Sequence, residues 1–186
     1  MLEAKKSERM VEYALSFLGT PYYWGGDDSF FMDCSGFLVE IGKSVGLHPH
    51  KYDNNAHGLW EYFRKGEREL NEVTRPGDHV FYFKDDYAAH VELAVNESQV
   101  IGASGGGRPQ FDLYYEMKKD AHLSAHYGQY SREDFYAKCM DDFSIRQLKH
   151  FLIIDEAVRR NAFIKIRPIG YRPKYKVCDP FKFTEI

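Results

Sequence analysis

The first third of the chain carries apolar residues at helical spacing. They recur every three or four positions over 5–18, and a glycine follows as a stop signal. A second helix is predicted to begin near Cys34, with an apolar stripe made of Phe37, Leu38, Ile41 and Val45. A third is predicted over 57–64. Residues 19–32 show no period and are rich in Gly, Asp and aromatic residues, so we expect an irregular loop there.

The middle of the chain changes to short runs typical of strands. A turn of sequence Arg-Pro-Gly-Asp at 75–78 precedes predicted strands over 79–83, 90–95 and 99–103. Only a short polar connection separates the last two strands, which favours a hairpin. Helices followed by a meander of strands indicate the α+β class, with the helices packed on an antiparallel sheet.

The remainder is harder to assign. Residues 108–150 look like an insertion beside a cleft, with helices predicted over 132–139 and 142–149. Further strands are predicted over 151–154 and 162–166. With 186 residues and 44% hydrophobic content, the chain is long enough for one real core, so we expect residues 1–186 to form a single domain.

Composition and charge exclude several classes of partner. A formal charge of −3 gives no field that would recruit nucleic acid or an anionic membrane. The N-terminus lacks the apolar core of a secretion signal, and no run reaches the roughly 18 apolar residues of a membrane span. We therefore expect a soluble protein made in the cytoplasm, with its site of action left open. Three cysteines at irregular spacing make neither a disulfide framework nor a zinc pattern.

Cys34 and His90 are the candidate nucleophile and base. A thiol in the first turn of a helix gains thiolate character from unpaired N–H groups and the helix dipole. An isolated cysteine is more often a small buried residue, and an isolated strand histidine is equally ordinary. Their surroundings favour catalysis, whereas Cys139 and Cys178 have no such context and are interpreted as structural.

Two phrases carry a specific resemblance. Residues 19–26 read Gly-Thr-Pro-Tyr-Tyr-Trp-Gly-Gly and residues 33–39 read Asp-Cys-Ser-Gly-Phe-Leu-Val. Pro-Gly-Asp at 76–78 and His-Val-Glu-Leu-Ala-Val at 90–95 follow in order. Together they resemble the NlpC-type cell-wall cysteine peptidases over roughly residues 11–107. The resemblance implies a papain-like fold with Cys34 and His90 as the catalytic pair. The glycine-rich loop and the tail look like those of phage-associated members.

The third catalytic position departs from that family. Its members usually place a polar orienting residue, most often His, on the strand after the catalytic one, where this chain has Gly102. Glu92 lies two residues after His90 and would share its strand face, and Ser104 lies just beyond the gap. Either could orient His90. The alternative is that Glu92 simply faces solvent.

The resemblance also implies substrate contacts. Tyr22 matches the tyrosine on the oxyanion side, and Asp33 matches a carboxylate that faces the substrate's free amine. Ser35 matches a neighbouring subsite residue, and Trp24 is a further candidate. We expect Asp33 to point away from the nucleophile toward a cationic group, because a carboxylate beside a thiol opposes thiolate formation. Tyr22 and Trp24 could equally be aromatic anchors of the loop.

The implied activity is hydrolysis of an amide bond in bacterial peptidoglycan stem peptides, of the γ-D-glutamyl-diamino acid type. No metal and no organic cofactor is implied, and the implied partner is the stem peptide. One alternative is an amidase or acyltransferase that uses the same pair on another acyl group. The other is a phage tail or virion component with weak chemistry, an idea motivated by Gly102.

Overall fold

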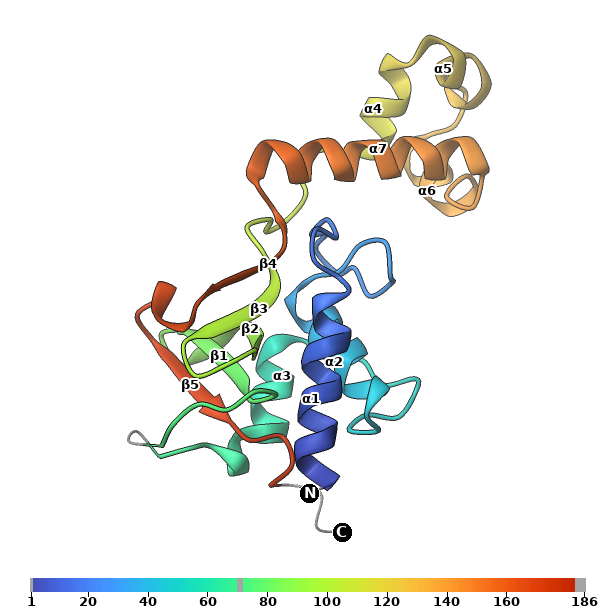
Figure 1. Ribbon diagram of the computed structural model, residues 1–186. Coiled ribbons are helices and arrows are strands. Elements are labelled where there is room, and N and C mark those ends of the chain that lie inside the picture. The colour runs from blue at the N-terminus through green and yellow to red at the C-terminus, as the bar shows by residue number, and fades with distance from the viewer. Residues whose placement is uncertain (1, 70–71, 183–186) are drawn as a thin grey trace.

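The computed structural model describes residues 2–69 and 72–182. Three helices lie against one face of a five-stranded antiparallel sheet, and a helical arm extends away from this body (Figure 1). The architecture is α+β, as predicted. Within the described residues, no helix combines the length and the apolar character needed to cross a bilayer.

The body follows the predicted order of helices and then strands. Its helices are α1 (Leu2–Leu15), α2 (Cys34–Ser44) and α3 (Ala56–Phe63), followed by the 3-10 turn η1 (Arg64–Gly66). The sheet has the order β4-β3-β2-β1-β5. Its strands are β1 (His79–Lys84), β2 (Tyr87–Ala94), β3 (Gln99–Ser104), β4 (Phe163–Pro168) and β5 (Tyr175–Cys178). The three helices and the first four of these strands were predicted, and β5 was not.

The two faces of β2 serve different purposes. Val91 and Leu93 point toward the helices and join the main core, which includes Phe37, Leu38 and Ile41 of α2. Because side chains alternate along a strand, His90 and Glu92 belong to the opposite face. That face also carries Tyr82 and Ala94 and is covered by the 3-10 turn η2 (Ile169–Tyr171). The packing of β2 therefore places His90 and Glu92 on the face away from the main core, whereas Cys34 packs against that core.

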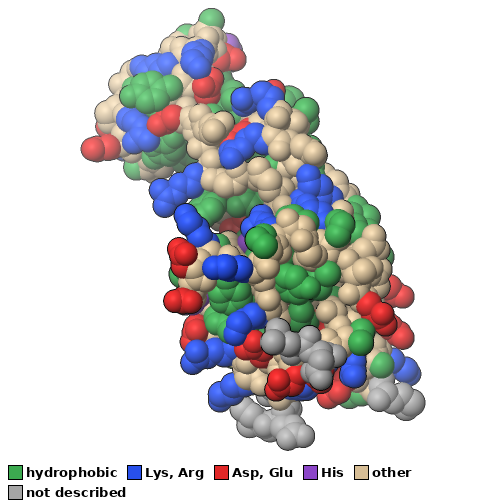
Figure 2. Space-filling model, turned by 90° about the vertical axis from the view of Figure 1, so that its left-hand side faces the viewer, with side chains coloured by type: hydrophobic (Ala, Val, Ile, Leu, Met, Phe, Trp, Pro, Cys, Tyr) green, Lys and Arg blue, Asp and Glu red, His purple; other side chains and the backbone are tan. Residues whose placement is uncertain are grey.

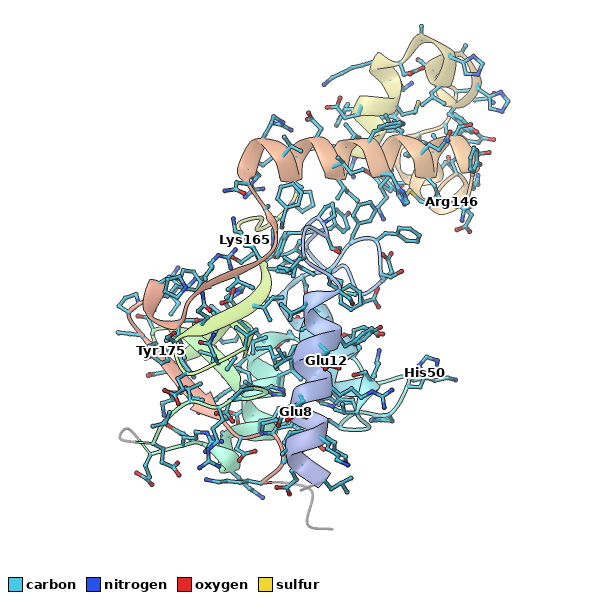
Figure 3. The ribbon with its side chains drawn as sticks, viewed as in Figure 1. Glu8, Glu12, His50, Arg146, Lys165 and Tyr175 are labelled. Carbon is cyan, nitrogen blue, oxygen red and sulfur yellow. The ribbon has the colours of Figure 1, made fainter. Side chains whose placement is uncertain are left out.

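The helical arm connects β3 to β4 and has a small apolar core of its own. It contains α4 (Leu113–Lys119), α5 (Ala121–Tyr127), α6 (Arg132–Lys138) and α7 (Phe143–Arg160). Its core includes Met117, Leu123, Phe135 and Ile145. In Figure 3, Arg146 lies on the part of α7 farthest from the sheet, and Lys165 lies where β4 leaves the arm. The helix predicted over 132–139 corresponds to α6.

The strand predicted over 151–154 is wrong, because these residues lie inside α7. A four-residue apolar run does not distinguish a strand from a buried helical segment by its period. The helix continues from an N-cap at Asp142 to Asn161, whose left-handed conformation (φ 50°) ends it. The arm's packing rewards this longer helix, since Ile145 is fully buried and Leu148 and Leu152 pack beside it.

A buried ion pair ties the Pro-Gly-Asp turn to the end of the sheet. The Arg68 guanidinium donates to Asp78 through Nε (2.6 Å) and Nη2 (2.8 Å), and it also reaches Asp179 at 3.2 Å. The Asp78 carboxylate accepts a further bond from the Arg75 N–H at 2.7 Å. Asp78 of the family-like phrase is therefore a structural residue that fixes the entry to β1.

We expect Arg68→Ala to lower the free energy of unfolding by roughly 3–5 kcal/mol, because it leaves the carboxylate of Asp78 buried without its cation. Urea unfolding followed by circular dichroism measures the change. Arg64→Ala is the control, since its pair with Glu61 is largely exposed and contributes little. Equal effects of the two substitutions would contradict this structural role for Arg68.

Candidate active site

Cys34 is the first residue of α2, and Asp33 caps the helix. The Asp33 Oδ1 atom accepts hydrogen bonds from the N–H groups of Ser35 (2.9 Å) and Gly36 (2.8 Å). A Cβ at Gly36 would lie 2.3 Å from the carbonyl oxygen of Gly26, so only glycine lets the preceding loop approach this close to the helix. The local sequence thus fixes both the helix start and the loop that packs on it.

Cys34 and His90 line one pocket of about 410 Å³. The pocket lies between the start of α2, strand β2 and the glycine-rich loop that follows β3. The backbone N–H of Val91 bonds to the Cys34 thiol, so the sulfur lies against the strand that carries His90. Every candidate proposed from the sequence lines this pocket except Glu92, which is buried behind His90. Those lining residues are Tyr22, Trp24, Asp33, Cys34, Ser35, His90 and Ser104.

Burial opposes the charged form of both catalytic candidates. Burial, together with the nearby carboxylate of Asp33, raises the pKa of the Cys34 thiol to about 12. The N–H groups of Val91 and Ser35 act in the opposite direction. Burial also lowers the pKa of His90. A helix start alone therefore does not produce the thiolate that the sequence suggested, and the thiol needs a base.

Glu92 holds the ring of His90. His90 Nε2 and Glu92 Oε1 are 3.1 Å apart, and the Glu92 side chain is fully buried. Because an ionised carboxylate can only accept, this contact places a proton on Nε2 and leaves Nδ1 of the neutral ring as the atom that can take the thiol proton. The Glu92 charge also raises the pKa of His90, against the larger effect of burial. The reading of Glu92 as a solvent-facing residue is wrong.

Two further groups bind the same carboxylate oxygen. Arg167 Nη1 of β4 donates to Glu92 Oε1 at 2.6 Å, and the Tyr171 hydroxyl donates to it at 3.1 Å. A buried carboxylate is costly unless it is paired, and Arg167 supplies the compensating charge. Ser104, the other candidate orienter, donates its hydroxyl to Tyr171. Ser104 thus contacts Tyr171, which binds Glu92, and it does not itself bind His90 in the described structure.

Gly102 makes room for Glu92. The pairing of Leu93 with Ile101, continued by one residue, brings Glu92 opposite Gly102. A Cβ at Gly102 would lie 2.5 Å from Glu92 Cγ and 3.0 Å from its Cβ. A side chain at position 102 and the Glu92 carboxylate cannot both occupy this space. The glycine on β3 therefore leaves the space that the Glu92 carboxylate on the neighbouring strand occupies.

Tyr22 is held against the glycine-rich loop. A Cβ at Gly106 would lie 1.8 Å from the Tyr22 ring, so the ring packs directly on the backbone there. Burial raises the pKa of Tyr22, as do the nearby Cys34 and Asp33, while a bond from the Gly107 N–H opposes this. The phenol is neutral at physiological pH, and its O–H is available as a donor beside the thiol.

The other predicted contact residues, Asp33, Ser35 and Trp24, also line the pocket. The Asp33 oxygens accept hydrogen bonds from backbone N–H groups, including Gly25 at 3.0 Å, and from the Ser35 hydroxyl at 2.8 Å. Both side chains are therefore committed to the helix start before any substrate binds, although both line the pocket. The contact of this carboxylate with a cationic group of the substrate stays a prediction. Trp24 lies half exposed on the rim, with the Arg108 guanidinium 5.8 Å from its ring centroid.

Sequence reasoning missed the contribution of the C-terminal segment. Arg167, Tyr171 and Arg172 lie more than 70 positions after His90, yet they bind Glu92 or line the pocket. The available signal was a Tyr-Arg pair shortly after a predicted strand, which points to no role by itself. Only the pairing of β4 with β3 brings these residues to the site.

The fold and this site define a cysteine-histidine protein of papain-like architecture, and the comparisons with known proteins agree. The model of the NlpC/P60 family matches residues 19–135, which is more than half of the chain. The chain belongs to the NlpC/P60 family.

Curated relatives match part of the chain. A probable endopeptidase of Mycobacterium tuberculosis is 29% identical over 101 residues, which cover 54% of this chain and 24% of the relative. A γ-D-glutamyl-L-lysine dipeptidyl-peptidase of Bacillus subtilis is 45% identical over 40 residues, covering 22% of this chain and 14% of the relative. The chain thus spans about a quarter or less of these relatives' length.

Among solved structures, the NlpC/p60 domain of the peptidoglycan hydrolase SagA aligns with 93% of this chain and 98% of its own length. The TM-score is 0.52 and the sequence identity is 16%. At this identity the likeness establishes the shared fold.

We expect Glu92→Gln to move the titration of the His90 ring to lower pH, because a carboxylate beside an imidazole favours its charged form. Nuclear magnetic resonance of the histidine ring against pH measures the midpoint. Glu97→Gln, an exposed change in the same hairpin, is the control and should leave it in place. An unmoved midpoint in Glu92→Gln would show that Glu92 does not act on His90.

Gly102→Ala is expected to displace the Glu92 carboxylate, lower the stability by about 1–3 kcal/mol and move the His90 midpoint in the same direction. Thermal unfolding and the same titration measure both effects. Gly170→Ala is the matched control, because a Cβ there meets no atom within 4 Å. A Gly102→Ala protein indistinguishable from the parent would show that Glu92 does not need the space left by the missing side chain at position 102.

Proposed function

We propose that this chain is a cysteine peptidase that hydrolyses peptidoglycan stem peptides at the amide between the γ-carboxyl of D-glutamate and a diamino acid. The observation that carries the proposal is the pocket that Cys34 and His90 share, with a buried carboxylate behind the histidine. The names of the relatives support the same substrate class: one is a dipeptidyl-peptidase for γ-D-glutamyl-L-lysine and others are probable endopeptidases.

The pocket favours this proposal over the rival acyl substrates. A narrow or wholly apolar pocket would suit a small acyl group, whereas this one has about 410 Å³ and is lined by charged and polar side chains, among them Asp33, Asn55 and Arg172. The motive for a non-catalytic role was the missing orienter at Gly102. Glu92 fills that role from the neighbouring strand, so the glycine no longer argues for lost chemistry.

In the proposed mechanism, His90 Nδ1 takes the proton of the Cys34 thiol as the sulfur attacks the scissile carbonyl. Glu92 stabilises the imidazolium that forms and keeps the ring oriented, because its charge raises the pKa of His90. Coupling proton transfer to attack avoids a free thiolate in a buried site where the pKa of the thiol is about 12.

The tetrahedral oxyanion is stabilised by the Tyr22 hydroxyl and by the Cys34 N–H, which lies at a helix start where N–H groups have no intrahelical partner. The imidazolium then gives its proton to the leaving amine, and the acyl group remains on Cys34 as a thioester. Water activated by His90 hydrolyses the thioester and restores the thiol. Each proton transfer uses the same ring nitrogen.

Purified muropeptides incubated with the protein and followed by mass spectrometry test the proposal. Cleavage should disappear in Cys34→Ala and fall by at least about 10³-fold in His90→Ala, since nucleophile and base act as a unit. The masses of the fragments identify the bond.

Cys139→Ala and His122→Ala are the matched controls, because Cys139 lies in the core of the arm and His122 is exposed on α5. Both should retain cleavage. Intact muropeptides together with a Cys34 that does not react with iodoacetamide near neutral pH would contradict the peptidase proposal. That outcome would favour the alternative of a phage tail or virion component.

A further inference from the structure

The catalytic pocket contains one uncommitted charge. Among the described residues that line it, Asp33 and Arg172 are the two with a full charge at neutral pH. Both oxygens of Asp33 already accept hydrogen bonds from the start of α2 and from Gly25. Arg172, by contrast, has no hydrogen bond or ion pair to any described residue. The charged side chain of the pocket that keeps its hydrogen-bonding groups free for a ligand is therefore the cation Arg172.

Aromatic rings hold the Arg172 guanidinium in place. Its carbon lies 5.2 Å from the ring centroid of Tyr171 and 5.6 Å from that of Tyr82. Contacts to ring faces attract a cation but leave its N–H donors free, and a guanidinium so held needs little reorganisation to bind a ligand. The Tyr171 hydroxyl in turn donates a hydrogen bond to Glu92, and this bond holds the Tyr171 ring in position.

Arg172 lies on the base side of the pocket. Its charge lowers the pKa of His90, so the two groups are close. Tyr22 and Asp33 interact electrostatically with Cys34 and with each other, which places them on the nucleophile side. Lys and Arg side chains are prominent on the face of the molecule seen in Figure 2, which is the left-hand side of Figure 1. The positive charge of Arg172 near His90 favours an anionic group of the substrate on this side of the pocket.

We infer that Arg172 is a specificity-determining residue that binds a carboxylate next to the scissile amide. The inference rests on the proposed function and names its substrate class: stem peptides whose residue at the cleaved bond carries a free carboxylate. Arginine forms paired, charge-assisted bonds with a carboxylate, which a carboxamide cannot match. Two sources offer this chemistry, the α-carboxyl of a γ-linked D-glutamate and the second carboxyl of diaminopimelate.

Four synthetic stem peptides separate the two sources. In them the α-carboxyl of the D-glutamate is free or amidated, and the diamino acid is meso-diaminopimelate or L-lysine. We expect wild-type kcat/KM to favour the free carboxylate by roughly 10- to 100-fold in one of these two comparisons. Arg172→Gln should reduce that ratio to within about 2-fold of one, while Arg172→Lys keeps part of it.

The ratio isolates recognition from catalysis. Loss of Arg172 also changes the charge felt by His90, but that effect is common to the two peptides of each comparison at one pH, so it cancels in the ratio. Arg159→Gln is the matched control, because Arg159 is exposed on α7 and pairs with Asp155. It should leave both ratios unchanged. Ratios that are the same in wild type and Arg172→Gln would overturn the assignment.

Binding measured in a Cys34→Ala background distinguishes failure of the inference from failure of the proposed function. Calorimetry with the same four peptides reports recognition without turnover. A carboxylate preference that disappears with Arg172→Gln, in a protein whose wild type cleaves none of the peptides, would support the role of Arg172 and contradict the peptidase proposal. The absence of any carboxylate preference in both cleavage and binding would overturn the role of Arg172.

Discussion

The site depends on one buried carboxylate. Glu92 has no exposed surface, and a single one of its oxygens binds His90, Arg167 and Tyr171. An ionised group in such a place is stable only when a cation and hydrogen bonds replace water, and Arg167 supplies the cation. The same contacts select the tautomer of His90. The stability of the sheet face and the chemistry of the base are thus consequences of one set of contacts.

This arrangement links the hairpin of β2 and β3 to the C-terminal segment, which is distant from it in sequence. Strand β2 supplies His90 and Glu92, β3 supplies the space at Gly102, and the C-terminal segment supplies Arg167 and Tyr171. The helical arm is inserted between β3 and β4, so the chain leaves the sheet and returns before the network closes. The antiparallel pairing of β3 with β4 restores the register on its return. The arm therefore extends the fold without separating the groups that act together.

The start of α2 shows how one local feature has opposing effects. Asp33 caps the helix and holds the loop that carries Tyr22 and Trp24, which builds one wall of the pocket. Its charge nevertheless raises the pKa of the adjacent thiol. Backbone N–H groups from Ser35 and Val91 offset part of this effect. The need for a strong, well-oriented base follows, and it connects the helix start to the network around Glu92.

Local patterns in the sequence determined the three helices of the body, most strands and the two candidates that share the pocket, Cys34 and His90, because helical period, strand alternation and short motifs depend on neighbouring residues. They did not determine α7, where packing in the arm extended a helix through an apolar run that resembles a strand. The sequence named Glu92 as a candidate, but the alternative of a solvent-facing side chain was equally consistent with it. Burial beneath Tyr171 and pairing with Arg167 decided the matter, since both contacts span more than 70 residues and arise only when β4 and the segment after it fold onto the sheet.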